Sequence, residues 1–343
     1  MNEETLLLAA LKRNPTPRPP VWLMRQAGRY MAEYRAVRQK ISFLDLCRNP
    51  SLCADVMAEA VEVLGVDAAI IFSDILPVLI PLGFELEYTA GNGPVIRNPF
   101  RTAEDLRRMP ERFNPASISF VFETAAETRR VVPHEKSVIG FAGAPFTLAS
   151  YAIEGGSSRR FTRTKQLMYN DPFLWAALMD RLTDASAASL LGQVDAGVDA
   201  VQIFDSWVGV LGPTDYEKYV FPYMEKLLLR LRRHVPIIYF SVGNPALLPI
   251  MARLPADCFG VDWRIPIRRA WEILGPEFAV QGNLDPAVLL ADRQKIRAEA
   301  YRILDEVGNR PGFIFNLGHG VLKETPVENV IELVNCVKEY RVA

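Results

Sequence analysis

Short apolar segments recur along the chain, and each is followed by a turn and then by a helical pattern. Eight such segments are rich in β-branched or aromatic residues: VWL from Val21, DAAIIF from Asp67, SVIGFA from Ser137, AVQIF from Ala200, PIIYFS from Pro236, CFGVDW from Cys258, FAVQGN from Phe278 and GFIFNLG from Gly312. Nearly continuous apolar strands that alternate with helices are typical of a parallel sheet covered on both faces.

The stretches between these segments place apolar residues at i, i+3, i+4 and i+7, and most of them end on glycine, as in SLCADVMAEAVEVLG from Ser51. Eight strands alternating with helices most simply close into a (β/α)8 TIM barrel. An open doubly wound sheet is the alternative, but no GxGxxG turn follows any of the strands. We therefore expect an α/β fold with the active-site cleft at the C-terminal ends of the barrel strands.

The pattern also predicts the domain organisation. Residues 1–343 are expected to form a single barrel domain. Residues 1–20 form a short N-terminal extension that includes the stiff stretch NPTPRPP. A Pro- and Gly-rich stretch at about 84–115 is expected to be an excursion after the second strand.

Composition narrows the classes of function. Thirty-nine Lys and Arg against 40 Asp and Glu leave a net charge of −1, which argues against a nucleic-acid partner and requires any anion site to be local. No apolar run reaches the roughly 18 residues of a membrane span. The four cysteines form no CxxC pair, and the N-terminus lacks a signal-peptide pattern, so a reducing cytoplasm is expected.

In such a barrel, the residues that follow the strands build the active site. Arg25 and Arg29 lie in MRQAGRY after the first strand, where two forked donors could bind carboxylates or phosphates. Gly28 between them would let the backbone approach a ligand closely. A pair of surface salt bridges is the alternative interpretation of the two arginines.

A carboxylate and a histidine stand at two other strand ends. Asp74 follows AAIIF and Ser73; it could instead cap a helix, but the next residues, ILPVLIPLG, are not an amphipathic helix start. His319 lies between two glycines after the eighth strand, and a structural role for it is equally open. His134 and His234 precede strands and are expected on the opposite, N-terminal face. No zinc triad and no phosphate-binding GxxxxGK[ST] loop occurs at the strand ends.

The segment PVWLMRQAGRYMAEYR closely resembles the N-terminal signature of the uroporphyrinogen decarboxylases, and GFAGAPFTLASYAIEGG resembles their second signature. IIFSDIL, DSWVG, QGNLDP and NLGHG match the remaining blocks of that family in order and spacing, from about Leu7 to Val337. The wider superfamily includes zinc-dependent corrinoid methyltransferases, which are the alternative function. Those enzymes need His and Cys ligands near strand ends, whereas here Cys258 begins a strand and the other cysteines fall on predicted helices: Cys47, Cys53 and Cys336.

The resemblance implies conversion of uroporphyrinogen III to coproporphyrinogen III and four CO2 in haem biosynthesis, by a homodimer without cofactor or metal. It also implies a set of substrate contacts, of which only Tyr151 is not already indicated by its position near a strand end: Arg25, Gln26, Ala27, Gly28, Arg29, Asp74, Tyr151, Ser206 and His319.

In the implied reaction, the pyrrole is protonated and then accepts the electrons of the breaking bond. Protonation makes the ring positive, so an anion near the ring is needed. An ionised Asp74 would stabilise the cation that results. Arg25 and Arg29 are poor acids and are better suited as carboxylate anchors, so His319, Tyr151 or a bound water remain candidate proton donors. A non-catalytic ligand-binding barrel is a further alternative, but it would not need to keep four polar residues together at the mouth: Arg25, Arg29, Asp74 and His319.

Overall fold

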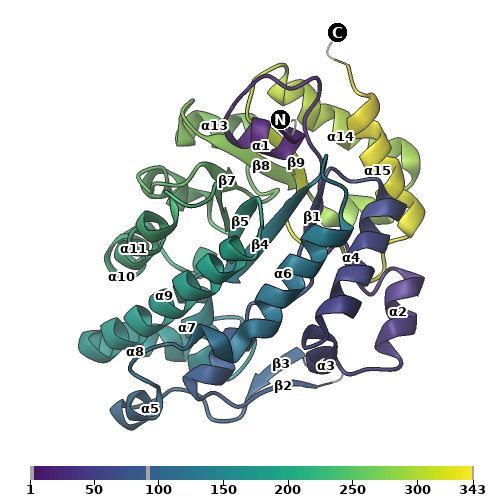
Figure 1. Ribbon diagram of the computed structural model, residues 1–343. Coiled ribbons are helices and arrows are strands. Elements are labelled where there is room, and N and C mark those ends of the chain that lie inside the picture. The colour runs from purple at the N-terminus through teal and green to yellow at the C-terminus, as the bar shows by residue number, and fades with distance from the viewer. Residues whose placement is uncertain (1–3, 90–92, 342–343) are drawn as a thin grey trace.

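A computed structural model describes residues 4–89 and 93–341, and its central feature is a curled, wholly parallel sheet (Figure 1). The strands follow the order β1-β4-β5-β6-β7-β8-β9, and their residues are buried almost throughout. Their bounds are β1 (Ala68–Ile70), β4 (Ser137–Gly143), β5 (Ala200–Asp205), β6 (Ile237–Ser241), β7 (Cys258–Gly260), β8 (Ala279–Leu284) and β9 (Phe313–Leu317). Seven of the eight predicted strands are confirmed.

The segment predicted as the first strand differs from the prediction. Val21 forms a single parallel bridge to Phe315 of β9, while its carbonyl accepts a hydrogen bond from the N–H of Asp67, just before β1 (N···O 2.8 Å). The segment therefore lies between the two edges of the curled sheet but is not a strand. Pro19 and Pro20 have no N–H to donate, and the chain turns again at Leu23, whose carbonyl accepts from the N–H of Gln26.

Helices pack against the outside of this sheet, with α6 and α9 lying against β4 (Figure 1). The α-helices are α1 (Leu6–Leu11), α2 (Ala32–Arg38), α3 (Phe43–Cys47), α4 (Pro50–Leu64), α5 (Ala103–Arg108), α6 (Ser119–Val131), α7 (Pro145–Glu154), α8 (Thr162–Asn170), α9 (Pro172–Asp195), α10 (Pro213–Tyr219), α11 (Phe221–Leu231), α12 (Leu248–Met251), α13 (Ile267–Leu274), α14 (Arg293–Val307) and α15 (Val327–Glu339). The 3-10 helices are η1 (Pro77–Leu82), η2 (Pro115–Ile118), η3 (Val208–Val210), η4 (Pro245–Leu247) and η5 (Pro286–Leu290).

Local signals set the helix ends. The α4 helix begins after Asn49, whose side chain accepts the N–H of Leu52, and has Pro50 in its first turn, where a missing N–H costs nothing. It ends at Gly65, whose φ of 67° lies in the left-handed region that glycine adopts without strain.

The stretch at about 84–115 contains the antiparallel hairpin β2 (Leu86–Thr89) and β3 (Gly93–Ile96), followed by α5. Residues 90–92, between the two strands, lie outside the described residues. The hairpin contacts η1, which follows β1, so it stands close to the C-terminal ends of the sheet strands.

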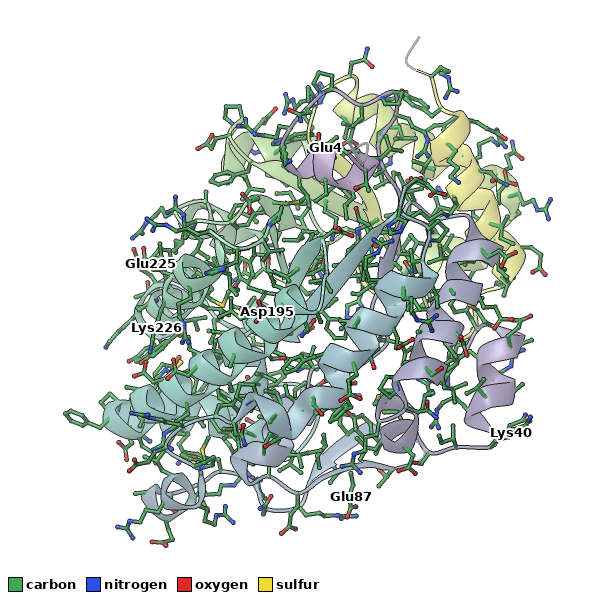
Figure 2. The ribbon with its side chains drawn as sticks, viewed as in Figure 1. Glu4, Lys40, Glu87, Asp195, Glu225 and Lys226 are labelled. Atoms are coloured by element: carbon green, nitrogen blue, oxygen red, sulfur yellow. The ribbon has the colours of Figure 1, made fainter. Side chains whose placement is uncertain are left out.

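Charged residues lie mainly at the periphery, as the labelled side chains of Lys40, Glu87 and Lys226 illustrate (Figure 2). Within residues 4–89 and 93–341, no helix combines the length and the apolar character that crossing a bilayer requires.

Candidate active site

The loop that follows Val21 is held in a compact turn. The hydroxyl of Tyr30 donates to the carbonyl of Gln26 (2.5 Å), and the N–H of Val321, beyond β9, donates to the carbonyl of Met24 (3.0 Å). Arg25 between them has a φ of 61°, in a region that residues other than glycine seldom adopt. The strained backbone of Arg25 is therefore fixed by contacts from both ends of the chain, a pattern that is common at functional sites.

Three residues of the predicted binding loop shape the loop itself. The side chain of Gln26 is fully buried and donates to the carbonyl of Ala68 (3.2 Å). Ala27 is also buried. A Cβ on Gly28 would stand 3.0 Å from the carbonyl oxygen of Arg25 and 3.3 Å from the ring of Tyr30. The close approach expected at Gly28 is therefore to other atoms of the same loop. This packing shapes the loop that carries Arg25 and Arg29.

Arg25 and Arg29 are both exposed, and neither guanidinium forms an ion pair within the part of the chain that the structure describes. The salt-bridge interpretation of the pair therefore finds no support among these residues. Two exposed guanidinium groups without a carboxylate partner are suited to binding anions.

The loop after β9 packs directly on Arg25. A Cβ on Gly320 would collide with Cδ of Arg25, so glycine at this position lets the Arg25 side chain pack closely against the loop. His319, next to it, is half-buried, and its pKa falls to about 4 because of burial and of the positive charges of Arg25 and Arg264. His319 is accordingly neutral near pH 7.

Asp74 is half-buried after β1, with one carboxylate oxygen engaged. Oδ1 accepts the N–H of Leu76 (2.9 Å), which is a local turn rather than the cap of an amphipathic helix, and Oδ2 accepts no hydrogen bond of regular geometry from the described residues. Burial raises the pKa of Asp74, while the Leu76 N–H, the Tyr88 hydroxyl and the charge of Arg25 oppose that rise.

Tyr88 is a neighbour of Asp74 that the sequence interpretation missed. It lies on β2, its ring centroid is 4.7 Å from that of Phe43, and its buried hydroxyl makes no hydrogen bond of normal geometry within the described residues. Burial, followed by the negative charge of Asp74, raises the pKa of Tyr88. Tyr88 reaches Asp74 because the hairpin folds back toward η1, and no local sequence motif predicts this contact.

Tyr151 and Ser206 come from neighbouring elements. The ring of Tyr151 on α7 packs edge-on against Trp207, with centroids 5.7 Å apart, and Ser206 precedes that tryptophan at the end of β5. Burial and the charge of Asp74 raise the pKa of Tyr151 to about 12, so its hydroxyl keeps its proton.

Asp205, immediately before Ser206, was not predicted as a site residue. It is fully buried, Thr147 Oγ1 donates to its Oδ1 (2.8 Å), and the hydroxyl of Tyr239 donates to its Oδ2 (2.8 Å). Burial raises the pKa of Asp205 to about 6. Thr147 Oγ1 also accepts the N–H of Trp207 (3.3 Å), so this network holds the loop after β5.

The predicted residues converge on Arg25. The charge of this arginine affects the pKa values of Asp74 after β1, Tyr151 on α7 and His319 after β9. The charge of Arg29 instead lowers the pKa of Tyr34 of α2, which burial raises. The cluster can bind anions through its arginines and can accept hydrogen bonds at the free oxygen of Asp74.

The side chains that could bind a metal do not form a comparable cluster among the described residues. Across residues 4–89 and 93–341, no set of three or more His, Cys, Asp or Glu side chains is arranged to hold a metal ion. The cysteines are all buried and unpaired: Cys47, Cys53, Cys258 and Cys336. His134 is exposed beyond α6, and His234 is exposed just before β6, as expected for the N-terminal side of the strands.

Comparison with known proteins identifies the family of the chain. Residues 2–340 match the sequence model of the family described as Uroporphyrinogen decarboxylase (URO-D). The chain is similar to proteins named uroporphyrinogen decarboxylase from Roseiflexus sp. strain RS-1 (47% identity over 339 residues, 97% of each chain) and from Thermus thermophilus (48% over 335 residues, 97% of each chain). A methyltransferase from Methanosarcina mazei shares the fold, with a TM-score of 0.80 at 22% identity over 98% of this chain and 99% of that one. The chain belongs to the uroporphyrinogen decarboxylase family.

Proposed function

We propose that this protein is a carboxy-lyase that removes CO2 from the four acetate side chains of uroporphyrinogen III and leaves methyl groups, giving coproporphyrinogen III. Membership of the family supports this function over the methyltransferase alternative. The structural observation that carries it is the convergence of Asp74, Tyr151 and His319 on Arg25 at the strand ends.

Arg25 and Arg29 would anchor the substrate. Uroporphyrinogen III has eight carboxylates, and the two exposed guanidinium groups can each form paired, charge-assisted hydrogen bonds with one of them. The buried Gln26, together with Ala27 and Gly28, gives the loop the shape that presents both arginines.

Asp74 would stabilise the charge that develops in the ring. Its unpaired Oδ2 can accept hydrogen bonds from pyrrole N–H groups. A proton then adds to the ring α-carbon next to the carbon that bears the acetate and forms an iminium-like cation. The electrons of the C–CO2⁻ bond flow into that conjugated ring, CO2 leaves, and an exocyclic methylene remains. A proton adds to the exocyclic carbon to complete the methyl group, and the ring α-carbon releases the first proton, which restores the pyrrole. The attraction between Asp74 and the ring is strongest when the ring is positive, so it lowers the barrier.

The pKa values narrow the choice of proton donor. With a pKa of about 4, His319 is protonated in roughly one molecule in a thousand at pH 7, and Tyr151, with a pKa of about 12, is a weak acid. These values favour a bound water as the donor, with neutral His319 and Tyr151 acting as hydrogen-bond partners of the substrate or of that water. Ser206 would contribute a further contact beside Tyr151.

The same proposal includes the assembly of the protein. Val21, bonded on both sides, would complete a (β/α)8 TIM barrel within one domain of residues 1–343. The resemblance to the family supports a homodimer that acts in the cytoplasm, with no cofactor, because the pyrrole ring itself accepts the bonding electrons.

Anaerobic incubation with uroporphyrinogen III, followed by oxidation and chromatography of the porphyrins, tests the function. We expect intermediates with seven, six and five carboxylates and a final product with four. Protein stripped with a strong chelator and dialysed should give the same rate. No decarboxylated product from folded protein would refute the proposal. Activity that is lost on stripping and restored by stoichiometric metal would refute cofactor independence.

A further inference from the structure

A third arginine stands at the mouth of the sheet, in the loop after β7. Arg264 forms an ion pair with the carboxylate of Asp262 through Nη1, and its own N–H donates to Oδ1 of the same residue (3.0 Å). Its guanidinium also lies over the ring of Trp263, 4.5 Å from the centroid. These contacts fix the guanidinium in one place.

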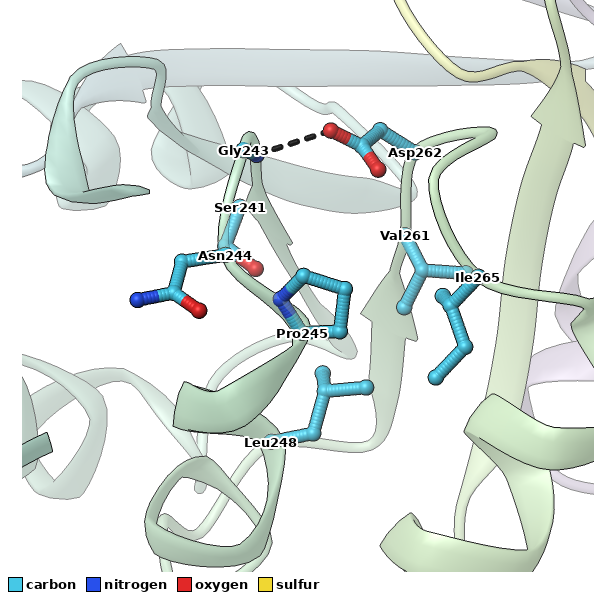
Figure 3. A pocket seen from close by; sticks show the side chains of 8 residues that line it. All are labelled: Ser241, Gly243, Asn244, Pro245, Leu248, Val261, Asp262 and Ile265. Carbon is cyan, nitrogen blue, oxygen red and sulfur yellow. Dashed lines mark hydrogen bonds between the residues drawn. The ribbon is translucent and has the colours of Figure 1, made fainter. Parts of the chain in front are cut away.

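Asp262 is itself held rigidly. It is 4% exposed, and its Oδ2 accepts the N–H of Gly243 from the loop after β6 (2.7 Å), as Figure 3 shows. The N–H of Gly243 and that of Arg264 would remain on this carboxylate if the side chain of Arg264 were changed. The position of the Asp262 carboxylate, which binds Arg264, therefore does not depend on the charge of Arg264.

The loop that bears Arg264 packs against the loop that bears His319. A Cβ on Gly318 would stand 2.7 Å from the backbone nitrogen of Trp263, and a Cβ on Gly320 would collide with the side chain of Arg25. The residue before Arg264 and the side chain of Arg25 therefore contact the two glycines that flank His319. Both positive charges lower the pKa of His319, after the larger effect of its burial.

We propose that Arg264 and Arg25 form a two-guanidinium cradle beside neutral His319 and that this cradle binds one carboxylate of the tetrapyrrole. The proposal rests on the proposed function and adds Arg264 as a residue that determines substrate affinity. The Arg264 side chain is 44% exposed, and its Nη2 and Nε make no hydrogen bond with the residues that the structure describes, so donors remain for a ligand.

The other side of Arg264 is less suited to an anion. A hollow there, toward α14, is lined by Trp263 and Asn283 together with Asp285, Glu299 and Arg302. Two carboxylates beside one further arginine give an incoming carboxylate little net attraction. The side facing His319 offers the second guanidinium, that of Arg25, which forms no ion pair among the described residues, so the ligand carboxylate belongs there.

Steady-state kinetics with uroporphyrinogen III test the cradle. Arg264→Gln should raise KM about tenfold with little change in kcat, because a charge-assisted contact made equally in ground and transition states is lost. Arg264→Lys should recover part of the affinity, since the charge returns without the fork. Arg269→Gln is the control, because this exposed arginine on α13 pairs with Glu272 away from the mouth.

A second measurement tests, independently of enzyme activity, whether the charge of Arg264 lies close to His319. The pKa of His319, followed by NMR, should rise in Arg264→Gln and stay unchanged in Arg269→Gln. An unchanged KM in folded Arg264→Gln, or an unchanged His319 pKa, would overturn the cradle. Inactivity of the unmodified protein would instead refute the proposed function, so the two failures are distinguishable.

Discussion

Two carboxylates follow strands of the same sheet, yet their surroundings differ in a decisive way. Asp205 is fully buried, and each of its oxygens accepts a hydrogen bond from a hydroxyl, on Thr147 and Tyr239. Asp74 is half-buried, and only Oδ1 has a partner among the described residues. A carboxylate whose acceptors are filled by the protein stabilises the fold, whereas one with an unused oxygen at the mouth is available to a ligand.

The same contrast extends to the neighbours of the two residues. At the mouth, Arg25 and Arg29 lack ion-pair partners and Tyr88 lacks a regular hydrogen bond, all within the described residues. Beneath it, the hydroxyl of Tyr216 lies 3.2 Å from that of Tyr239, so the network around Asp205 continues into the core. Unsatisfied groups therefore gather where the substrate is proposed to bind.

The largest expected effect separates the two carboxylates directly. Asp74→Asn keeps the size of the side chain and removes its charge, so kcat for uroporphyrinogen III should fall about 100-fold or more in a protein that stays folded. Asp285→Asn is a matched control, because Asp285 forms the same local turn with the N–H of Ala287 (2.9 Å) outside the cluster. Unchanged turnover of Asp74→Asn would remove the catalytic role from Asp74.

Variants of Arg29 test whether this exposed arginine binds a carboxylate of the substrate. Arg29→Ala removes a charge-assisted contact of roughly 1.5–3 kcal/mol, so substrate affinity should weaken by about 10- to 100-fold. Arg29→Lys should restore only part of it, because the planar fork is lost. If both variants bind the porphyrinogen as the unmodified protein does, the exposed arginine has a structural role instead.

Asp205 should respond in stability rather than in chemistry. Asp205→Ala leaves the hydroxyls of Thr147 and Tyr239 without their acceptor, which should lower the free energy of unfolding by about 2–4 kcal/mol in denaturant titrations. The folded fraction should keep most of its kcat. A loss of kcat as large as that of Asp74→Asn, without loss of stability, would erase the distinction between the two carboxylates.

The pH dependence of this stability has a definite sign. The pKa of Asp205 is about 6 in the folded protein and near 3.8 when unfolded, so between these values the unfolded state binds fewer protons. The contribution of protonated Asp205 is therefore complete below pH 3.8 and is lost as the pH rises through 6. Unfolding of the unmodified protein and of Asp205→Asn across this range should show the difference shrinking with rising pH.

The smallest predicted effect is a shift of a pH profile. The Tyr88 hydroxyl lowers the pKa of Asp74, so Tyr88→Phe should raise it and move the acid limb of kcat/KM toward higher pH. At pH values well above that limb the rate should change little. Tyr169→Phe is the control, since the hydroxyl of this exposed tyrosine bonds to Asp215 on the outside. Superimposable profiles for Tyr88→Phe and the unmodified protein would exclude coupling to Asp74.

Sequence patterns predicted the sheet well because its buried strands are nearly continuous apolar runs. They failed at Val21, where two prolines that cannot donate hydrogen bonds reduce an apolar segment to a single bridge. The position of Asp74 after a strand was readable, but its free oxygen was not, because hydrogen-bond occupancy depends on atoms from other segments.

The sequence also could not predict the direction in which a side chain points or the contacts between segments that are far apart in the chain. Gln26 stands in the middle of a recognisable binding motif, yet its side chain turns inward to the carbonyl of Ala68. Tyr88 reaches Asp74 only through the return of a hairpin, and Arg264 lies beyond the predicted strand segment CFGVDW, in the loop after β7. No local sequence pattern shows that this loop packs against the loop of His319.

The bridge at Val21 also orders events during synthesis. Its partner Phe315, and Val321, whose N–H bonds to the carbonyl of Met24, leave the ribosome long after the loop that bears Arg25 and Arg29. Contacts that span nearly the whole chain form late, because the long loop between them must close first. Until then the arginine loop lacks the partner that holds its strained turn. A chain truncated before Phe313 should thus keep much of its helix content and have no ordered arginine loop, so the nascent protein can order this loop only after β9 has been made.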